Sequence, residues 1–323
     1  MRLVSFAAAG LATGAGRAVG ALEGDQVLAL GRAVVLLGRP EAEAARLSTL
    51  EAMLEAWHEN FALARDVLAE ASSPAGAKAS AMARRPFASL SVLPPVAHPP
   101  SFRDAYAFEA HVRNARARRG LDVPPEWYEA PVYYYSNPGA FLGHRQPVPK
   151  PLWTEALDYE LELGWVIGVK ARDVRAEEWR AVVAGFTILN DWSARDVQRR
   201  EMAVGLGPAK GKDFATSLGP ALVTLDELEG AWEGDAVALA MEASVNGRRL
   251  SWGNSREMRY GVGDVVARAS QDVYLFPGDV FGSGTVGTGC LLELGPDVHR
   301  WLQPGDEVTL SIERLGALTN PVV

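Results

Sequence analysis

The chain has 323 residues, of which 48% are hydrophobic, so it can bury a large core and fold as one to three domains. A net charge of −8 argues against nucleic acid as a partner. The arginine-rich run at residues 113–119 is expected to be a solvated helix face rather than a patch for anionic substrates. A single cysteine, Cys290, excludes a disulfide within the chain and fits a cytoplasmic setting.

The first segment allows two interpretations. Met1 and Arg2 are followed by an apolar stretch over residues 3–12, which has features of a secretory signal peptide. The same stretch fits a first strand, with further strands at 17–22 and 26–30. We favour the strands because the pattern continues as hairpins and lacks a convincing cleavage site. No apolar stretch reaches the length of a transmembrane helix, so we expect no membrane contact.

The N-terminal part is predicted to be a small α+β domain. Short strands are expected up to about residue 38, and the apolar spacing becomes helical over 39–72. Residues 73–86 have the composition of a linker, and residues 87–93 suit a strand that is ended by prolines. We therefore predict a domain of strands plus one helical segment over residues 1–90 and a larger domain over residues 91–323.

The larger domain is predicted to contain many strands and few helices. The expected elements are a helix over residues 102–119, strands over 131–170, a helix over 176–184, a strand over 185–190, a short helix over 196–202, a Gly-rich loop over 205–219, and then strands with one helix near 263–270. Because strands do not alternate with long helices, a doubly wound parallel sheet is disfavoured. A strand-rich α+β fold with a rolled or barrel-like core fits better.

Two glycine-rich motifs lack the context that nucleotide binding requires. Residues 282–287 match G-x-G-x-x-G, but residues 288–294 are predicted to form a strand rather than a helix, and no βαβ unit surrounds them. The pair Gly211-Lys212 lacks the other residues of a P-loop. With one cysteine, thiolate-rich zinc sites are also excluded.

Two carboxylates in an apolar run give the first indication of chemistry. If this run is a strand, Glu160 and Glu162 point to the same side while Leu161 and Leu163 face a core. Adjacent, partly buried carboxylates repel each other, so a positive group should lie between them. A hard divalent cation is the simplest candidate, and Asp191 at the end of another apolar run could supply a third oxygen ligand.

Other polar groups recur near the ends of the apolar strands. Asp104 and His111 lie seven residues apart on the predicted helix and therefore on nearly one face. The remaining groups are Asp191 with Arg195 and Gln198 on one segment, Lys210 and Lys212 in the Gly-rich loop, and Glu293 in an apolar strand.

Each group also has a purely structural interpretation. A lone histidine on an amphipathic helix is usually structural, Asp104 suits a helix cap, and Arg195 with Asp196 suits a surface ion pair. The glutamate pair suits an edge strand that faces solvent, and the loop lysines suit a solvated surface. Together these interpretations leave unexplained why acidic and basic groups recur at the strand ends.

The chain resembles the fumarylacetoacetate hydrolase family over about residues 95–315. The segments that carry the resemblance are Arg103-Asp104 with Phe108 and His111, Asp158 to Glu162, Asn190 to Gln198, Gly207-Pro208 with Gly211 to Phe214 and Thr216, and Gly282 to Thr285 with Glu293. Residues 1–90 resemble the smaller N-terminal domain of longer members more loosely.

The resemblance implies a mixed β-roll, a homodimer and one Mg²⁺, Mn²⁺ or Ca²⁺ ion per active site. By position it implies metal ligands at Asp104, Glu160, Glu162 and Asp191, and a general base at His111 that is oriented by Glu293. It also implies oxyanion-stabilising groups at Arg195, Gln198 and Lys212. Substrate contacts are implied at Tyr106 and Thr285, and a secondary cation environment at Lys212 and Thr216. At two substrate-binding positions the chain departs from longer members. Gly120, beside Arg119, replaces an arginine that grips the substrate carboxylate, and Met202 replaces a tyrosine. Both changes weaken the case for fumarylacetoacetate itself as the substrate.

The activity that the resemblance implies is hydrolysis of a C–C bond in a β-dicarbonyl acid, such as fumarylacetoacetate or an acylpyruvate, in aromatic catabolism or tyrosine degradation. His111 would deprotonate water, Arg195, Gln198 and Lys212 would stabilise the oxyanion, and the metal would take up enolate charge. A lyase or isomerase for 2-oxo acids, such as a hydratase or an oxaloacetate-type decarboxylase, is the alternative. A non-catalytic binding protein is a third hypothesis.

Overall fold

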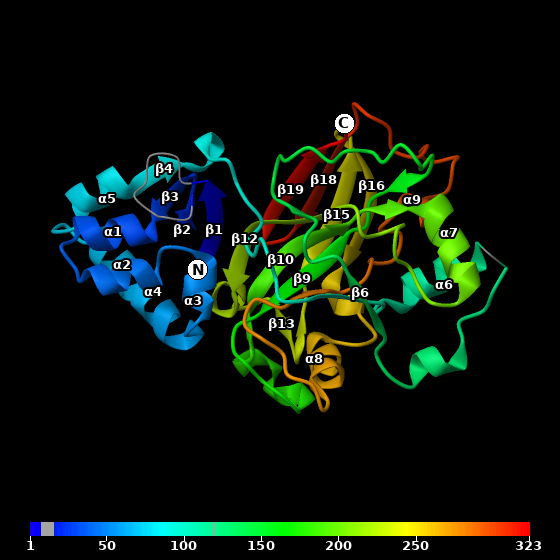
Figure 1. Ribbon diagram of the computed structural model, residues 1–323, viewed down its shortest axis with the longest axis horizontal. Coiled ribbons are helices and arrows are strands. Elements are labelled where there is room, and N and C mark those ends of the chain that lie inside the picture. Colours follow the sequence, from blue (N-terminus) through cyan, green and yellow to red (C-terminus); the bar gives the residue numbers. More distant parts are fainter. Residues whose placement is uncertain (8–15, 119) are drawn as a thin grey trace.

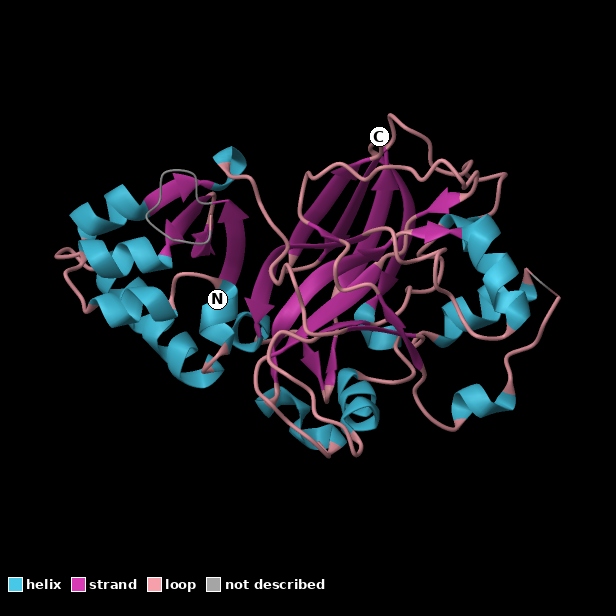
Figure 2. Cartoon of the chain, viewed as in Figure 1, coloured by secondary structure: helices cyan, strands magenta, loops and turns pink. Residues whose placement is uncertain are grey.

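The computed structural model describes residues 1–7, 16–118 and 120–323. Figure 1 shows a smaller lobe, blue to cyan, formed by the N-terminal part of the chain, and a larger lobe formed by the rest. Helices lie on the outer side of the small lobe and at the margins of the large lobe, while strands run through the centre (Figure 2). No helix within the described ranges combines the length and apolar character needed to cross a bilayer.

The small lobe combines a hairpin-rich sheet with short helices. Its elements are β1 (Arg2–Ala7), β2 (Arg17–Glu23), β3 (Gln26–Ala29), α1 (Leu30–Leu36), α2 (Glu41–Arg46), α3 (Leu50–Leu54), α4 (Trp57–Ser72), α5 (Ala77–Ala83), β4 (Arg84–Pro86) and the 3₁₀ turn η1 (Phe87–Ser89).

The larger lobe is rich in strands, as expected. Its strands are β5 (Phe102–Ala105), β6 (Tyr133–Ser136), β7 (Phe141–Leu142), β8 (Leu157–Asp158), β9 (Glu162–Ile167), β10 (Val183–Asp191), β11 (Ser193–Ala194), β12 (Thr216–Thr224), β13 (Trp232–Glu233), β14 (Ala236–Val237), β15 (Ala240–Val245), β16 (Arg248–Asn254), β17 (Val280–Gly282), β18 (Glu307–Ile312) and β19 (Gly316–Pro321). Its helices and 3₁₀ turns are α6 (Glu109–Ala117), η2 (Pro125–Tyr128), η3 (Ala176–Ala181), α7 (Arg195–Val204), η4 (Leu225–Leu228), η5 (Ser255–Glu257), α8 (Val262–Ser270) and α9 (Leu291–Leu294).

One mixed sheet runs through both lobes. Its strand order is β4-β3-β2-β1-β12-β10-β9-β17-β5-β6, and β7 pairs with β12. The pairs β17–β5 and β12–β7 are parallel, whereas the pairs that β10 makes with β9 and β12 are antiparallel. A second sheet, β16-β15-β18-β19, contacts the first through β18 and β19. The strand-rich α+β fold that the sequence predicts is therefore confirmed.

The small lobe packs against the large sheet through a shared apolar core. This core joins buried residues of the small lobe, including Leu3, Leu28, Leu54 and Trp57, to Phe102, Val166, Leu189, Leu218 and Val280 of the large sheet. Strand alternation places Phe102 on the same sheet face as Asp104, and Leu189 on the same face as Asp191. The small lobe and these carboxylates therefore lie on the same face of the sheet, at different positions along the strands.

Several predicted elements of the small lobe are wrong in type. Residues 30–36 form helix α1 instead of continuing a strand, and the predicted linker 73–86 contains α5 and β4. The predicted strand at 87–93 begins with η1 instead. The stretch 39–72 is helical as predicted, although it is divided among α2, α3 and α4. Part of the predicted first strand, residues 8–12, lies outside the described residues. The domain boundary near residue 90 stays a prediction.

The predicted helix over residues 102–119 is also wrong in its first part. Residues 102–105 are four consecutive buried residues of β5, which lies between β17 and β6 in the sheet. Pairing on both sides satisfies the backbone of this segment, so the helix begins only at Glu109. Residues 288–294, predicted as a strand, end in the one-turn helix α9. The predicted helix over 176–184 is the 3₁₀ turn η3, and Val183 already belongs to β10.

Candidate active site

Three carboxylates meet where β5 and β9 flank β17 in the large sheet. Asp104 of β5, Glu162 at the start of β9 and Glu160 just before it each offer an oxygen atom, and these atoms lie within 4.8 Å of one another. All three side chains are buried. Gly282 of β17 separates two of them, and a Cβ atom there would lie 2.4 Å from Asp104 Oδ1 and 2.6 Å from Glu162 Oε2. The absence of a side chain at this position makes room for the carboxylate cluster.

Asp191 joins this cluster through a lysine. It is the last residue of β10, and its Oδ2 atom lies 2.7 Å from the ammonium of Lys212, which also lies 2.5 Å from Glu160 Oε2. The hydroxyl of Tyr134 donates a hydrogen bond to Asp191, and Thr216 Oγ1 lies 3.4 Å from its other oxygen. Lys212 and Thr216 therefore both lie beside Asp191, and their role as a secondary cation environment stays a prediction.

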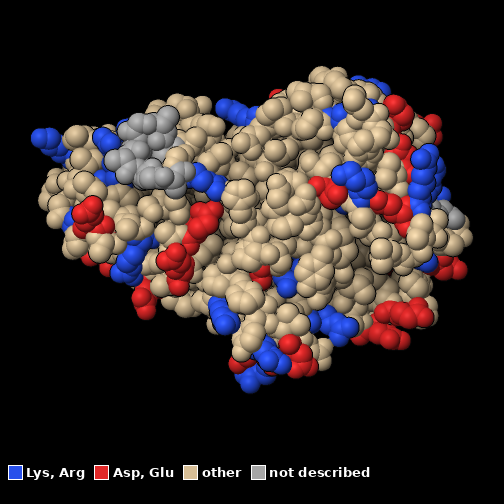
Figure 3. Space-filling view, viewed as in Figure 1, with Lys and Arg blue, Asp and Glu red and all other residues tan. Residues whose placement is uncertain are grey.

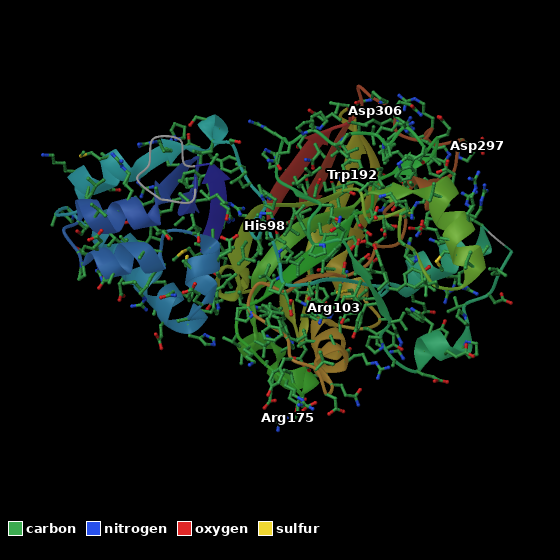
Figure 4. The ribbon with its side chains drawn as sticks, viewed as in Figure 1. His98, Arg103, Arg175, Trp192, Asp297 and Asp306 are labelled. Atoms are coloured by element: carbon green, nitrogen blue, oxygen red, sulfur yellow. The ribbon has the colours of Figure 1, made fainter. Side chains whose placement is uncertain are left out.

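A residue adjacent to each of these two aspartates, Arg103 before Asp104 and Trp192 after Asp191, anchors the strands. Arg103 and Trp192, labelled in Figure 4, lie among the strands of the larger lobe. The indole of Trp192 donates to Ser217 at 2.8 Å, and the guanidinium of Arg103 lies 3.5 Å from Asp279. Both side chains are buried. Strand alternation directs Arg103 away from the face that carries Asp104, so its ion pair fixes the strand without entering the cluster.

The carboxylates resist ionisation together. Burial raises the pKa of Asp104 well above its ordinary value, and the charge of Asp191 raises it further. Burial likewise raises the pKa of Glu162, with Asp104 adding to the effect, and burial raises that of Asp191 against the opposing pull of Lys212. With all four carboxyl groups ionised, the cluster would hold more negative charge than its neighbouring cations compensate.

Glu160 is the exception among the four carboxylates. Burial opposes its ionisation, but Lys212 and Arg195 outweigh burial and hold its pKa below the ordinary value. Glu162 Oε1, in contrast, is buried without a hydrogen-bond partner among the described residues. An unpartnered buried oxygen in an excess of carboxylates fits a hard divalent cation, for which carboxylate oxygens are the preferred ligands.

A histidine and a glutamate form a second buried group. His111 of α6 places Nδ1 2.6 Å from Glu293 Oε1, and the other oxygen of Glu293 accepts hydrogen bonds from Asn114 Nδ2 at 2.8 Å and from the Thr288 amide at 2.9 Å. Burial opposes ionisation of Glu293, but its contacts with His111, Thr288 and Asn114 together outweigh burial and lower the pKa of Glu293. An ionised Glu293 can only accept, so Nδ1 carries the proton and Nε2 keeps a free lone pair.

Arg195 and Gln198 lie together on the first turn of α7. Arg195 Nη2 lies 2.8 Å from Glu160 Oε1, and its Nη1 donates to Gln198 Oε1 at 3.0 Å. Since Glu160 also contacts Lys212, the three predicted oxyanion-stabilising residues converge on one side of the carboxylate cluster. Arg195 and Lys212 are both buried. On the face shown in Figure 3, by comparison, the surface over the centre of the larger lobe is mostly uncharged.

The predicted substrate contacts differ in their surroundings. The ring of Tyr106 meets that of His111 edge to face, with centroids 5.4 Å apart, and Thr285 Oγ1 is buried without a hydrogen-bond partner in the described part of the chain. The amide of Gly284, next to Thr285, donates to both Asp104 and Glu162 at 3.1 Å. Met202 lies one turn beyond Gln198 and is 41% exposed. Arg119 lies outside the described residues.

The structure brings the predicted residues together by a route that differs from the predicted one. Asp104 and His111 do not share a helix: they come from β5 and α6. Glu160 precedes β9 instead of lying within it, and Glu293 lies on α9 instead of on a strand. Asp191 ends β10, whereas Arg195 begins α7.

Sequence reasoning missed two residues of the site. Asp158 had a signal, because it stands two residues before Glu160 in the same acidic run. Tyr134 had none, because its position within a run of three tyrosines says nothing about which ring faces Asp191.

Comparison with known proteins gives a family match over most of the chain. The model for the fumarylacetoacetate (FAA) hydrolase C-terminal family matches residues 101–323. The mitochondrial oxaloacetate tautomerase FAHD2A of Homo sapiens is 37% identical over 208 residues, which are 64% of this chain and 62% of that protein. The 2,4-didehydro-3-deoxy-L-rhamnonate hydrolase of Sphingomonas sp. strain SKA58 is 33% identical over 199 residues, which are 61% of this chain and 65% of that one. The matched region therefore spans less than two thirds of either relative.

Solved structures resemble the chain over its whole length. A putative HpcE protein from Mycobacterium smegmatis has a TM-score of 0.74 at 23% identity, and the match covers 100% of this chain and 99% of that one. Maleylpyruvate hydrolase from Sphingobium sp. SYK-6, in complex with manganese(II) ion and pyruvate, has a TM-score of 0.68 at 22% identity, with coverage of 100% and 99%. At these identities the likeness shows a shared fold that includes the N-terminal lobe.

Proposed function

Because the chain belongs to the fumarylacetoacetate hydrolase family, we propose that it is a divalent-metal-dependent hydrolase that cleaves a C–C bond of an acylpyruvate-like β-dicarbonyl acid. The observation that carries this proposal is the buried His111–Glu293 pair, joined at 2.6 Å. His111 lies close enough to Glu160 to influence the pKa of its carboxyl group, so the pair lies within electrostatic reach of the carboxylate cluster. A base and a cation-binding cluster side by side are what hydrolysis of a dicarbonyl requires.

The carboxylate cluster is the proposed metal site. Asp104, Glu160 and Glu162 would hold the ion, with Asp191 beside them. A bound divalent cation would supply Lewis-acid stabilisation for enolate charge. The unpartnered oxygen of Glu162 supports this assignment, as does the raised pKa of the neighbouring carboxyl groups. The manganese in the structurally similar maleylpyruvate hydrolase gives further support.

His111 is the proposed general base. Glu293 holds the proton on Nδ1, so Nε2 can take a proton from a water molecule. The hydroxide oxygen then bonds to the acyl carbonyl carbon. When the C–C bond breaks, its electron pair passes to the 2-oxo acid fragment as an enolate, which takes up a proton at carbon. The products are a carboxylate and a 2-oxo acid.

Arg195, Gln198 and Lys212 would stabilise the tetrahedral oxyanion. Burial opposes the charge on Lys212, but Asp191 and Glu160 raise its pKa, so its ammonium stays charged at neutral pH. Arg195 is permanently charged and is fixed by its contact with Glu160. Donors fixed before the reaction stabilise developing charge without reorganisation, which is the usual origin of a large rate effect.

A second candidate is tautomerisation or decarboxylation of an oxaloacetate-type 2-oxo acid. The 37% identical oxaloacetate tautomerase favours it. In tautomerisation the same His111 would remove a proton from the substrate carbon instead of from water. Hydrolysis and tautomerisation share the enolate and differ in whether a C–C bond breaks.

Product analysis distinguishes the candidates. The protein is stripped of metal with a chelator, reloaded with Mn²⁺, and incubated separately with acetylpyruvate, fumarylacetoacetate and oxaloacetate. Two carbon fragments support hydrolysis, a faster approach to keto–enol equilibrium supports tautomerisation, and CO₂ with pyruvate supports decarboxylation. Turnover that is the same with and without metal, or no turnover of any of the three, contradicts the metal-dependent enzyme proposed here.

A further inference from the structure

Asp158 is buried and contacts both Arg195 and helix α9, which carries Glu293. Its side chain has no exposed surface, and Oδ2 accepts a hydrogen bond from Arg195 Nε at 2.7 Å. The same carboxylate accepts from two backbone amides, that of Leu291 at 2.8 Å and that of Leu292 at 3.0 Å. Both oxygens are therefore engaged with protein donors.

The two amides belong to the first turn of α9, which carries Glu293. This helix has only four residues, and its N-cap residue Cys290 makes no side-chain capping bond. A carboxylate that accepts from the first amides of a helix stabilises it, because these amides have no partner within the helix. Asp158 thus supplies from a distant strand the cap that α9 lacks locally.

Arg195 is fixed in the same region by backbone pairing. Strand β8, which ends at Asp158, pairs with β11, and its Leu157 and Asp158 lie opposite Ala194 and Ser193. The Arg195 amide donates to Ala156 at 2.9 Å. The side chain and the backbone of one short segment therefore hold the start of α7 next to the start of α9.

We propose that Asp158 is a positioning residue that sets Arg195 relative to the His111–Glu293 pair. The proposal rests on the proposed function, in which these groups act on the same reacting atoms. Asp158 touches neither substrate nor metal in this scheme: it acts through the guanidinium on one side and through α9 on the other. Displacement of catalytic groups by even about 1 Å can cost roughly 100-fold in rate.

The test is Asp158→Asn in the full-length, Mn²⁺-loaded protein. Asparagine keeps the shape of the side chain but turns an NH₂ group toward either Arg195 or the α9 amides, so a donor faces a donor. We expect kcat to fall by about 100-fold, while KM and the Mn²⁺ dissociation constant change far less. Asp196→Asn is the matched control, because Asp196 is the next residue after Arg195 but bonds to Thr154 and the Glu155 amide. This control should keep the wild-type kcat.

A double-mutant cycle and an NMR measurement separate positioning from general structure. In an Arg195→Lys background, Asp158→Asn should cost less than it does alone, because part of its effect passes through Arg195. The Nδ1–H resonance of His111, one of five histidines, should shift in Asp158→Asn and not in Asp196→Asn. This resonance needs no turnover, so it tests the positioning of the pair even if the proposed reaction is wrong.

Two results overturn the proposal. The first is a folded Asp158→Asn protein with wild-type kcat and an unshifted His111 resonance. The second is a parallel loss of Mn²⁺ binding and kcat, which would make Asp158 part of the metal site. If Asp158→Asn does not accumulate in folded form, Asp158→Glu keeps the charge and moves the carboxylate by one methylene. That variant should fold and show the same fall in kcat with unchanged Mn²⁺ binding.

Discussion

The ammonium of Lys212 lies 2.7 Å from Asp191 Oδ2 and thereby binds the end of β10 to the loop that follows α7. The same ammonium contacts Glu160, so one buried cation compensates two carboxylates. Asp104 and Glu162 make no such contact with it, and burial raises the pKa of both carboxyl groups. The cluster therefore has a compensated half, Glu160 and Asp191, and an uncompensated half, Asp104 and Glu162. A divalent cation would bind most favourably at the uncompensated half.

Glu162→Gln tests this division. The substitution replaces a buried carboxyl group, whose ionisation is unfavourable, by a neutral amide, so the metal-free protein should become slightly more stable or stay unchanged. Mn²⁺ affinity should fall by at least the roughly 10–100-fold that loss of an outer-shell partner costs. Thermal unfolding with chelator and Mn²⁺ titration by calorimetry measure the two effects. Glu242→Gln, at an exposed glutamate of β15, is the control and should change neither. Unchanged Mn²⁺ affinity in Glu162→Gln would contradict the assignment of the ligand.

Lys212→Met should have the opposite effect on the metal-free protein. Removing one partner of a buried ion pair leaves uncompensated charge, which typically costs about 3–5 kcal/mol in the free energy of unfolding. Adding Glu160→Gln to this variant should recover part of the loss, because it removes one of the two carboxylates that Lys212 compensates. Denaturant unfolding of the single and double variants measures the coupling. Strictly additive losses would show that Lys212 does not compensate Glu160.

The part of the site that could be predicted from the sequence rests on local spacing. Repulsion between Glu160 and Glu162 indicates a cation whatever the surrounding fold, and the two residues do meet in a buried cluster. Asp104 illustrates the limit. It enters the cluster because β5 pairs with β17, which is far away in the sequence, and this pairing replaces the helix that the local pattern favours. Non-local strand pairing leaves no periodic signal in a single sequence.

Hydrogen bonds between carboxylates and backbone amides are a second kind of contact that could not be predicted from the sequence. Asp158 and Glu201 accept hydrogen bonds from amides of segments that the fold brings to them. Every residue except proline has an amide, so no residue type marks the partner. Only the residues with chemically distinctive partners, such as His111 with Glu293, could be paired from the resemblance to a family.

His144 should make stability depend on pH in the mildly acidic range. Burial and the charge of Arg145 lower its pKa from 6.5 to about 4, and its Nδ1 accepts a hydrogen bond from the Thr319 amide at 3.1 Å. Between these two pKa values the unfolded chain binds a proton that the folded chain does not. The stabilising contribution is therefore present above pH 6.5 and is lost as the pH falls toward about 4.

Comparison of wild type with His144→Gln isolates this contribution. Thermal unfolding is followed at several pH values between 4 and 7. Glutamine can accept from the Thr319 amide but does not titrate, so the variant should lose less stability than the wild type as the pH falls. His58→Gln, at an exposed histidine of α4, is the control. Parallel pH profiles for wild type and His144→Gln would show that His144 keeps an ordinary pKa in the folded chain.

Glu201 should control catalysis through the loop that carries Lys212. On α7, one turn beyond Gln198, its carboxylate accepts from the amides of Ala209 at 2.9 Å, Lys210 at 2.7 Å and Gly211 at 3.1 Å. Burial opposes its ionisation, but these amides outweigh burial and lower its pKa, so Glu201 is charged at neutral pH. Glu201→Ala removes all three bonds and should lower kcat by about tenfold through a less fixed Lys212.

Glu201→Gln and Gly211→Ala complete the test of this loop. Glutamine keeps one acceptor oxygen, so its kcat should lie between those of wild type and Glu201→Ala. A Cβ atom at Gly211 would lie 2.8 Å from the Gln198 amide nitrogen, so Gly211→Ala should separate the loop from α7 and lower kcat while leaving Glu201 in place. Hydrogen exchange over residues 205–215 should be faster in all three variants. Wild-type exchange together with a reduced kcat would mean that Glu201 acts on the reaction by some route other than this loop.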